Sequence, residues 1–68
     1  MSKLERNIRK AITKARKSGI TGMSLANLKQ VTPTDGLVEA GITPAEYHRT
    51  FDSLALRAAA SRRFTIIH

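Results

Sequence analysis

The chain has 68 residues, and its twelve lysines and arginines against five acidic residues give a net charge of +7. This length suits one small domain over residues 1–68, which buries only about 60% of its unfolded surface. Without cysteine the chain forms no disulfide and holds no thiolate-bound metal. The N-terminus lacks the apolar core of a signal peptide, and no apolar run is long enough to span a bilayer. We therefore expect a cytoplasmic protein with no membrane partner.

The positive charge is concentrated at the two ends of the chain. Residues 1–20 hold seven basic side chains and one acidic one, residues 21–56 hold two basic and four acidic, and residues 57–68 hold three basic ones. The isoelectric point of about 11 is typical of proteins that bind nucleic acid. The composition therefore favours a polyanionic partner.

A first helix is expected to begin after Ser2, because Ser2 and Glu5 have the spacing of a capping box. Gly19 suits the left-handed position that ends a helix, with Ile20 folding back. Apolar residues recur between these points with helical spacing and predict a buried stripe. The stripe consists of Leu4, Ile8, Ala11, Ile12 and Ala15.

The remaining arc of this helix is almost entirely basic. A charged arc is usually only a solvated face, but seven basic side chains with one acid exceed what solubility requires. We therefore expect these side chains to contact DNA phosphates without reading sequence. The residues are Lys3, Arg6, Arg9, Lys10, Lys14, Arg16 and Lys17.

The middle of the chain predicts a short second helix. Residues 21–23 form either a turn or a short strand, Ser24 is the N-cap of the helix, and Pro33 ends it. Residues 33–40 are either a loop with turn chemistry or a helical turn that would be a rival second helix. In this second helix, over residues 25–31, the side chains expected to face the core are Leu25, Leu28 and Val31.

The third helix has the clearest start in the chain. Thr43 is a good N-cap, Pro44 suits the first helical position, and Glu46 completes a capping box. Ile42 and Tyr47 flank the cap as a hydrophobic staple. The expected buried stripe is Tyr47, Phe51, Leu54, Ala55 and Ala58. The opposite face holds Arg49, Asp52, Ser53 and Leu56.

Residues 63–67 are rich in β-branched and aromatic side chains and predict a C-terminal strand. An unpaired strand edge attracts a partner, either residues 21–23 or the same strand of a second copy. The expected fold is therefore mainly α, with three helices on one core and a minor β element.

This order of elements resembles a winged helix-turn-helix domain. In such domains Met23-Ser24-Leu25-Ala26-Asn27-Leu28 stands where a short strand meets the second helix, and the third helix is the recognition helix. The run Leu37-Val38-Glu39-Ala40-Gly41-Ile42-Thr43-Pro44 also resembles the glycine-containing turn of bacterial helix-turn-helix repressors, and it assigns a different second helix. Two features depart from the pattern: the connection from Val31 to Thr43 is long, and only one strand is present where a wing has two.

The resemblance implies that the third helix meets base edges of double-stranded DNA. Arg49 is the best candidate for bidentate contact with guanine. Because Glu46 and Asp52 balance the arginines of this helix, an ordinary surface is the alternative. The implied base-reading residues are Thr43, Ala45, Glu46, His48, Arg49 and Ser53. Arg62 and Arg63 would contact phosphates beside the groove, or alternatively protect the edge of the C-terminal strand by their charge.

Leu56 lies opposite the apolar stripe of the third helix and close to the C-terminal strand. It is either a singly exposed leucine or, together with Ile67, a seat for a second subunit. A homodimer is therefore a hypothesis.

These features predict a small sequence-specific DNA-binding protein, a transcriptional regulator of repressor type that joins the nucleoid when it binds. The alternative is an adapter that docks an acidic protein, and RNA binding is a third interpretation that the shortage of exposed aromatics weakens. We do not expect an enzyme, a cofactor or a metal. The chain has no phosphate-binding glycine loop or nucleophile motif, and His48 and His68 have no carboxylate at metal-ligand spacing.

Overall fold

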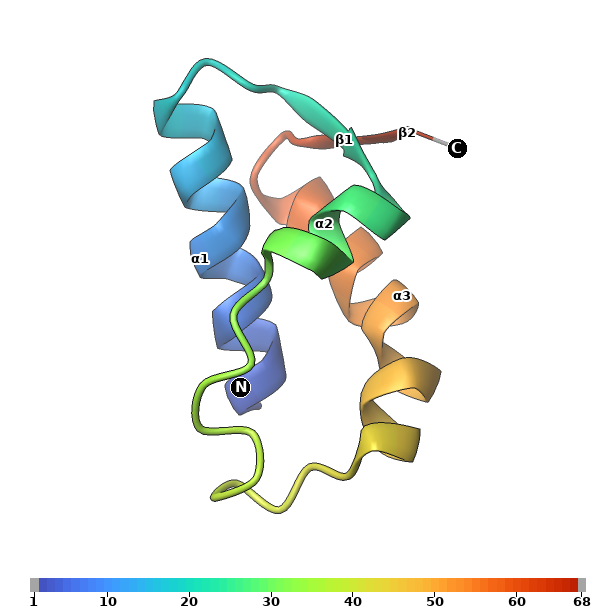
Figure 1. Cartoon of the computed structure of the whole chain (residues 1–68). Helices are drawn as coiled ribbons and strands as arrows, with labels where there is room; N and C mark the ends of the chain where they lie inside the picture. Colours follow the sequence, from blue (N-terminus) through green and yellow to red (C-terminus); the bar gives the residue numbers. More distant parts are fainter. Residues whose placement is uncertain (1, 68) are drawn as a thin grey trace.

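The computed structural model describes residues 2–67, which form three helices and a two-stranded sheet (Figure 1). The helices are α1 (Lys3–Lys17), α2 (Leu25–Val31) and α3 (Pro44–Ser61). The strands are β1 (Gly22–Ser24), between α1 and α2, and β2 (Thr65–Ile67), after α3. The predicted fold class, mainly α with a minor β element, is confirmed.

Helix α1 begins and ends as its sequence predicts. The Ser2 hydroxyl accepts a hydrogen bond from the Glu5 backbone N–H at 3.1 Å. At the other end Gly19 has a φ of 85°, and the Ile20 N–H donates to the Ala15 carbonyl at 2.9 Å, which closes a Schellman motif. All five residues of the predicted stripe are buried. The basic arc of α1 consequently faces away from the core.

Helix α2 is capped by Ser24, whose hydroxyl accepts from the Asn27 N–H at 3.2 Å. Leu28 is fully buried and Leu25 is half-buried, but Val31 is 54% exposed, so its predicted inward position is wrong. A spacing of three residues turns a helical side chain back by about 60° each time. Of three positions at that spacing, only the central one can point directly at the core.

The connection between α2 and α3 contains a single helical turn and no further helix. The Ile42 N–H donates to the Leu37 carbonyl at 2.9 Å, and Gly41 takes the left-handed conformation with a φ of 79°. Leu37 is buried in the core. Residues 33–40 are therefore a structured loop, and the rival second helix does not form.

Helix α3 starts at the predicted cap, with the Thr43 hydroxyl accepting from the Glu46 N–H at 3.1 Å. Three residues of its expected stripe, Phe51, Ala55 and Ala58, are buried, and the other two are half-buried. The predicted staple residues are also half-buried against the core. The face expected to be outward is exposed throughout: Arg49, Asp52, Ser53 and Leu56.

The C-terminal strand is shorter than predicted, because β2 begins at Thr65 and not at residue 63. Arg63 lies in the turn after α3 with a φ of 55°, a left-handed conformation that cannot continue into a strand. β2 pairs in parallel with β1, with Gly22 opposite Thr65 and Ser24 opposite Ile67. Of the two predicted partners, the strand of the same chain is therefore correct, displaced by one residue from 21–23.

Candidate nucleic-acid interface

The basic residues of α1 lie on the outer face of the helix. Five of them, Arg6, Lys10, Lys14, Arg16 and Lys17, are exposed, and Lys3 and Arg9 are half-buried. This follows from the sequence directly, because the apolar stripe takes the opposite side of the helix into the core. The protein therefore carries a continuous cationic surface along α1.

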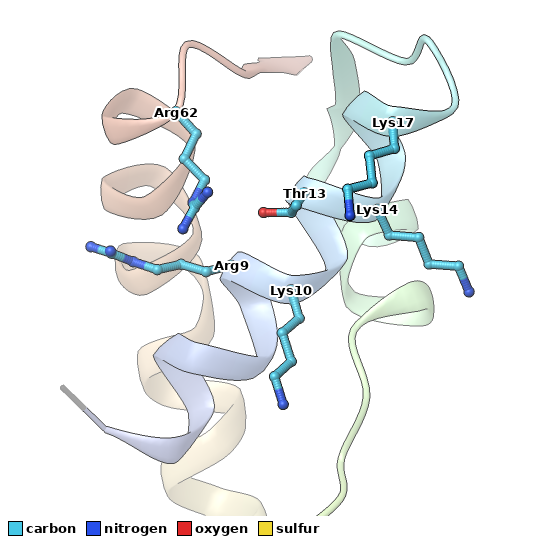
Figure 2. Close-up of a pocket in the computed structure, with 6 residues that line it drawn as sticks. All are labelled: Arg9, Lys10, Thr13, Lys14, Lys17 and Arg62. Carbon is cyan, nitrogen blue, oxygen red and sulfur yellow. The ribbon is translucent and has the colours of Figure 1, made fainter.

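An open depression of about 350 Å³ lies on this surface, between α1 and the C-terminal end of α3 (Figure 2). A second depression of about 280 Å³ adjoins it and shares Thr13, Lys17 and Arg62. No acidic side chain of residues 2–67 lines either hollow. The first is lined by Arg9, Lys10, Thr13, Lys14, Lys17 and Arg62. We call these six residues the basic depression.

Arg62 reaches α1 because of the way α3 ends. It is the C-cap of α3, and the next residue, Arg63, reverses the chain in the left-handed conformation. The Phe64 N–H donates to the Ala59 carbonyl at 2.8 Å, and the buried Phe64 ring anchors the turn. Figure 2 shows the Arg62 side chain extending from the end of α3 toward Arg9. The turn thus brings a cation from one end of the sequence to the helix at the other end.

Arg9 is held on one side by a buried carboxylate. Glu5 is 8% exposed, and its Oε2 lies 3.4 Å from Nη2 of Arg9, one helical turn away. The other Glu5 oxygen, Oε1, lies 3.8 Å from Nη1 of Arg57 on α3. Glu5 therefore does more than the capping role that its position in the sequence indicates, since it links α1 to α3 and orients Arg9.

Two polar atoms at the basic depression lack a partner. The Nε atoms of Arg9 and Arg62 are buried and have no hydrogen-bond acceptor among residues 2–67. A buried donor without an acceptor costs about 1–3 kcal/mol, so nearly all such donors in folded proteins are paired. Both orphaned donors belong to arginines that line the same hollow.

Thr13 is a site residue that the charge pattern alone does not reveal. It lies between Arg9 and Lys17 at four-residue intervals on α1, so the three side chains share one helical face. Its hydroxyl points into the space beside Arg9 and Arg62 (Figure 2). The four-residue spacing of Thr13 from Arg9 and Lys17 was the sequence signal that could have identified it as a site residue.

Four of the predicted phosphate contacts lie outside the basic depression: Lys3, Arg6, Arg16 and Arg63. Lys3 crosses the loop after α2, where a Cβ on Gly36 would be 2.6 Å from its Cε. Arg63 is exposed at the turn after α3. The structure therefore unites only part of the predicted phosphate-contacting set.

The predicted base-reading residues lie on the surface of α3 and at its N-cap, Thr43, with Glu46 half-buried and the others exposed. His48 turns toward α2, where its Nδ1 lies 3.1 Å from Nζ of Lys29. Figure 1 places α1 at the left and α3 at the right, so the outer faces of the two helices point in different directions. The predicted base-reading surface and the basic depression are consequently separate surfaces.

Two aromatic residues on the inner face of α3, Tyr47 and Phe51, contact Lys29 of α2. Tyr47 is half-buried, and its burial raises the pKa of the phenol above the usual value of 10.0. Nζ of Lys29 lies 5.5 Å from the centre of the Tyr47 ring and 5.4 Å from that of Phe51, within the range of a cation–π contact. Lys29 therefore caps the apolar stripe of α3 instead of adding to the basic face of α1.

Comparison with protein families, curated proteins and solved structures gives no match to this chain. Over residues 2–67, no group of three or more His, Asp or Glu side chains is placed to hold a metal ion. None of the helices described is both long and apolar enough to cross a bilayer. The functional argument therefore depends on the geometry and charge of the surface.

Proposed function

We propose that the protein binds double-stranded DNA through the basic face of α1 and Arg62. The observation that carries this proposal is the basic depression, where two distant segments of the chain place five cations around one hollow without an acidic residue in its lining. Such a grouping is electrostatically unfavourable unless a polyanion occupies it. Lysine and arginine at a DNA backbone gain affinity by releasing condensed counterions.

The finer part of the proposal is regulation by base reading. Arg49 is exposed on the outer face of α3 and free to reach a guanine edge, as the resemblance to helix-turn-helix repressors implies. Base contacts by α3 would make the protein a transcriptional regulator, whereas contacts by α1 alone would make it a sequence-independent binder.

The first experiment is a fluorescence anisotropy titration of a random DNA duplex at two salt concentrations. If six or more phosphates are contacted, affinity falls about a thousandfold between about 50 mM and about 200 mM salt. The triple variant K10Q/K14Q/K17Q should bind far more weakly and show a shallower salt dependence. Binding through the phosphate backbone also predicts that R49Q, which removes an exposed cation from α3 outside the basic depression, leaves random-duplex affinity within about twofold. Absence of binding at the lower salt concentration would contradict the proposal.

Base reading has its own test, which is selection of a preferred site from a random duplex library. A regulator should enrich a defined sequence, and R49Q should relax the preference at one base pair by about 1–3 kcal/mol. If no sequence is enriched, the proposal of regulation by base reading is contradicted, while the proposal of binding to the DNA backbone is unaffected.

A protein-interaction adapter is the second candidate, supported by apolar groups on the side of α3. Leu56 is 43% exposed and Val38 is 84% exposed, and Val38 borders a hollow of about 280 Å³ at the start of α3. This function predicts tight binding of a polyglutamate peptide together with undetectable binding of the DNA duplex. The associated dimer hypothesis uses Leu56 and Ile67, both exposed, and a sedimentation series over concentration would end it if only monomer is found.

A further inference from the structure

The basic depression contains a more specific feature than its total charge. Arg9 comes from α1 and Arg62 from the end of α3, and both line the same hollow with the Thr13 hydroxyl (Figure 2). The backbone of Arg62 is fixed by the turn that the buried Phe64 anchors, and Glu5 restrains the Nη2 end of Arg9. The two arginine side chains therefore border one space from different elements, with Arg9 restrained at its guanidinium and Arg62 fixed at its backbone.

The unpartnered atoms of these arginines indicate what the space accepts. Each Nε–H is buried without an acceptor among residues 2–67. The edge of a guanidinium that carries Nε–H also carries an Nη–H, and together they match two oxygens of a phosphate or carboxylate. Nη2 lies on the same edge of the guanidinium as Nε, so Glu5 restrains this edge of Arg9 while Nε–H stays without an acceptor. A tetrahedral oxyanion supplies enough oxygens for both arginines and for the Thr13 hydroxyl.

We propose that this crevice is a discrete phosphate site in which Arg9 and Arg62 bind the same phosphate group by their Nε edges, with the Thr13 hydroxyl as a third donor. The inference rests on the proposed function in that the group is a phosphate of the DNA backbone. The adjoining depression, which continues past Lys17 to Arg16, gives the strand a cationic path beyond the site. The other cations of α1 attract DNA, whereas this pair fixes its register on the protein.

Charge-conserving variants separate a geometric site from a charged patch. R9K and R62K keep the cation but lose the planar fork, and each should weaken DNA binding about tenfold at constant salt with an unchanged salt slope. R9K/R62K should lose much less than the product of the single effects, because both side chains bind one phosphate. The matched control is R6K, an exposed arginine of α1 outside the hollow, with an expected change below about twofold. Thermal unfolding of each variant confirms that the fold is intact.

The outcomes distinguish the site from the function. If the wild type binds DNA while R9K, R62K and R6K behave alike, DNA binding stands and the phosphate site is overturned. Additive losses in R9K/R62K overturn a shared phosphate in the same way.

A second measurement decides the question without DNA. Inorganic phosphate is added to ¹⁵N-labelled protein while the arginine Nε–H signals are followed by NMR, with chloride at equal ionic strength as the control. Saturable shifts of the Arg9 and Arg62 signals, without shift of the Arg6 signal, support the site. Equal movement of all arginine signals overturns it. Saturable shifts in a wild type that fails to bind DNA would keep the site, remove the proposed function and identify a free phosphate compound as the ligand.

Discussion

At the scale of single residues, Arg63 carries backbone strain that its side chain does not relieve. Its φ of 55° is the left-handed conformation, where a Cβ costs about 1–2 kcal/mol, and Arg63 does not line the basic depression. Glycine removes the strain but loses more entropy on folding. We expect R63G to raise the free energy of unfolding by about 0.5–1 kcal/mol in urea titrations. R63A keeps the Cβ and should give no gain, so an equal effect of both variants would contradict the explanation.

Tyr47 offers a pH-dependent test of the packing of α3. Its folded-state pKa is raised above 10.0 by burial, so the unfolded chain loses this proton first as pH rises. The Tyr47 phenol therefore contributes fully to the free energy of unfolding below pH 10, and this contribution is lost as the pH rises through the folded-state pKa. As the chain has one tyrosine and no tryptophan, tyrosinate absorbance reports this group alone.

The titration midpoint of the folded protein should lie above 10, and that of the protein in denaturant should lie lower. In Y47F the alkaline decline of stability should be smaller than in the wild type, because the phenol with the raised pKa is gone. Identical midpoints in the folded and denatured protein would show that the ring is not desolvated.

At the scale of elements, the same chain reversal ends three helical segments. In each, an N–H bonds to the carbonyl five residues earlier: Ile20 to Ala15, Ile42 to Leu37 and Phe64 to Ala59. The left-handed residue is glycine in the first two. The apolar residue after it packs against the core at Ile42, whereas Ile20 is 43% exposed. Gly19 and Ile20 made the first stop predictable. The third stop was missed because arginine occupies the position that normally shows glycine.

The loop between α2 and α3 depends on one buried amide of α1. Asn7 is 1% exposed, and its Nδ2 donates to the carbonyls of Pro33 at 3.0 Å and of Asp35 at 3.1 Å. N7A should lower the free energy of unfolding by about 2–3 kcal/mol, because two partly buried carbonyls lose their donor and a buried side chain is truncated. N7D should lower it further, since a carboxylate would face the same carbonyls. Urea unfolding measures both, with N27A as the exposed control expected to change stability by less than about 0.5 kcal/mol.

The helices and their buried faces were predictable because caps and apolar periodicity are local signals. Ser2, Ser24 and Thr43 all accept the expected N–H. Residues 21–23 were one of two expected partners of the C-terminal strand, but the parallel direction and the register were not predictable, since three-residue strands far apart in sequence carry little pattern. The same limit applied to the site: the cations of α1 were predictable, but the approach of Arg62 depends on how α3 packs against α1.

At the scale of the whole molecule, positive charge and unpartnered hydrogen-bond donors meet at the basic depression. The cations of α1 repel one another and Arg62, and this repulsion opposes folding whenever no anion is bound. If DNA covers the basic depression, the outer face of α3 with Arg49 and Leu56 points elsewhere, because α1 and α3 lie on opposite sides of Figure 1. Under the proposed function, the molecule would use two separate surfaces, one for the phosphate backbone and one for base edges or a second protein.

An anion that binds only the folded state must raise its stability, and this gives the last prediction. Phosphate at about ten times its dissociation constant should add about 1.4 kcal/mol to the free energy of unfolding, measured by circular dichroism during thermal unfolding. Chloride at equal ionic strength screens repulsion without filling the site and should stabilise less. In R9K/R62K the net charge is unchanged, so screening persists while the difference between phosphate and chloride should shrink. Equal stabilisation of the wild type by both salts would mean that the depression holds charge but no binding geometry.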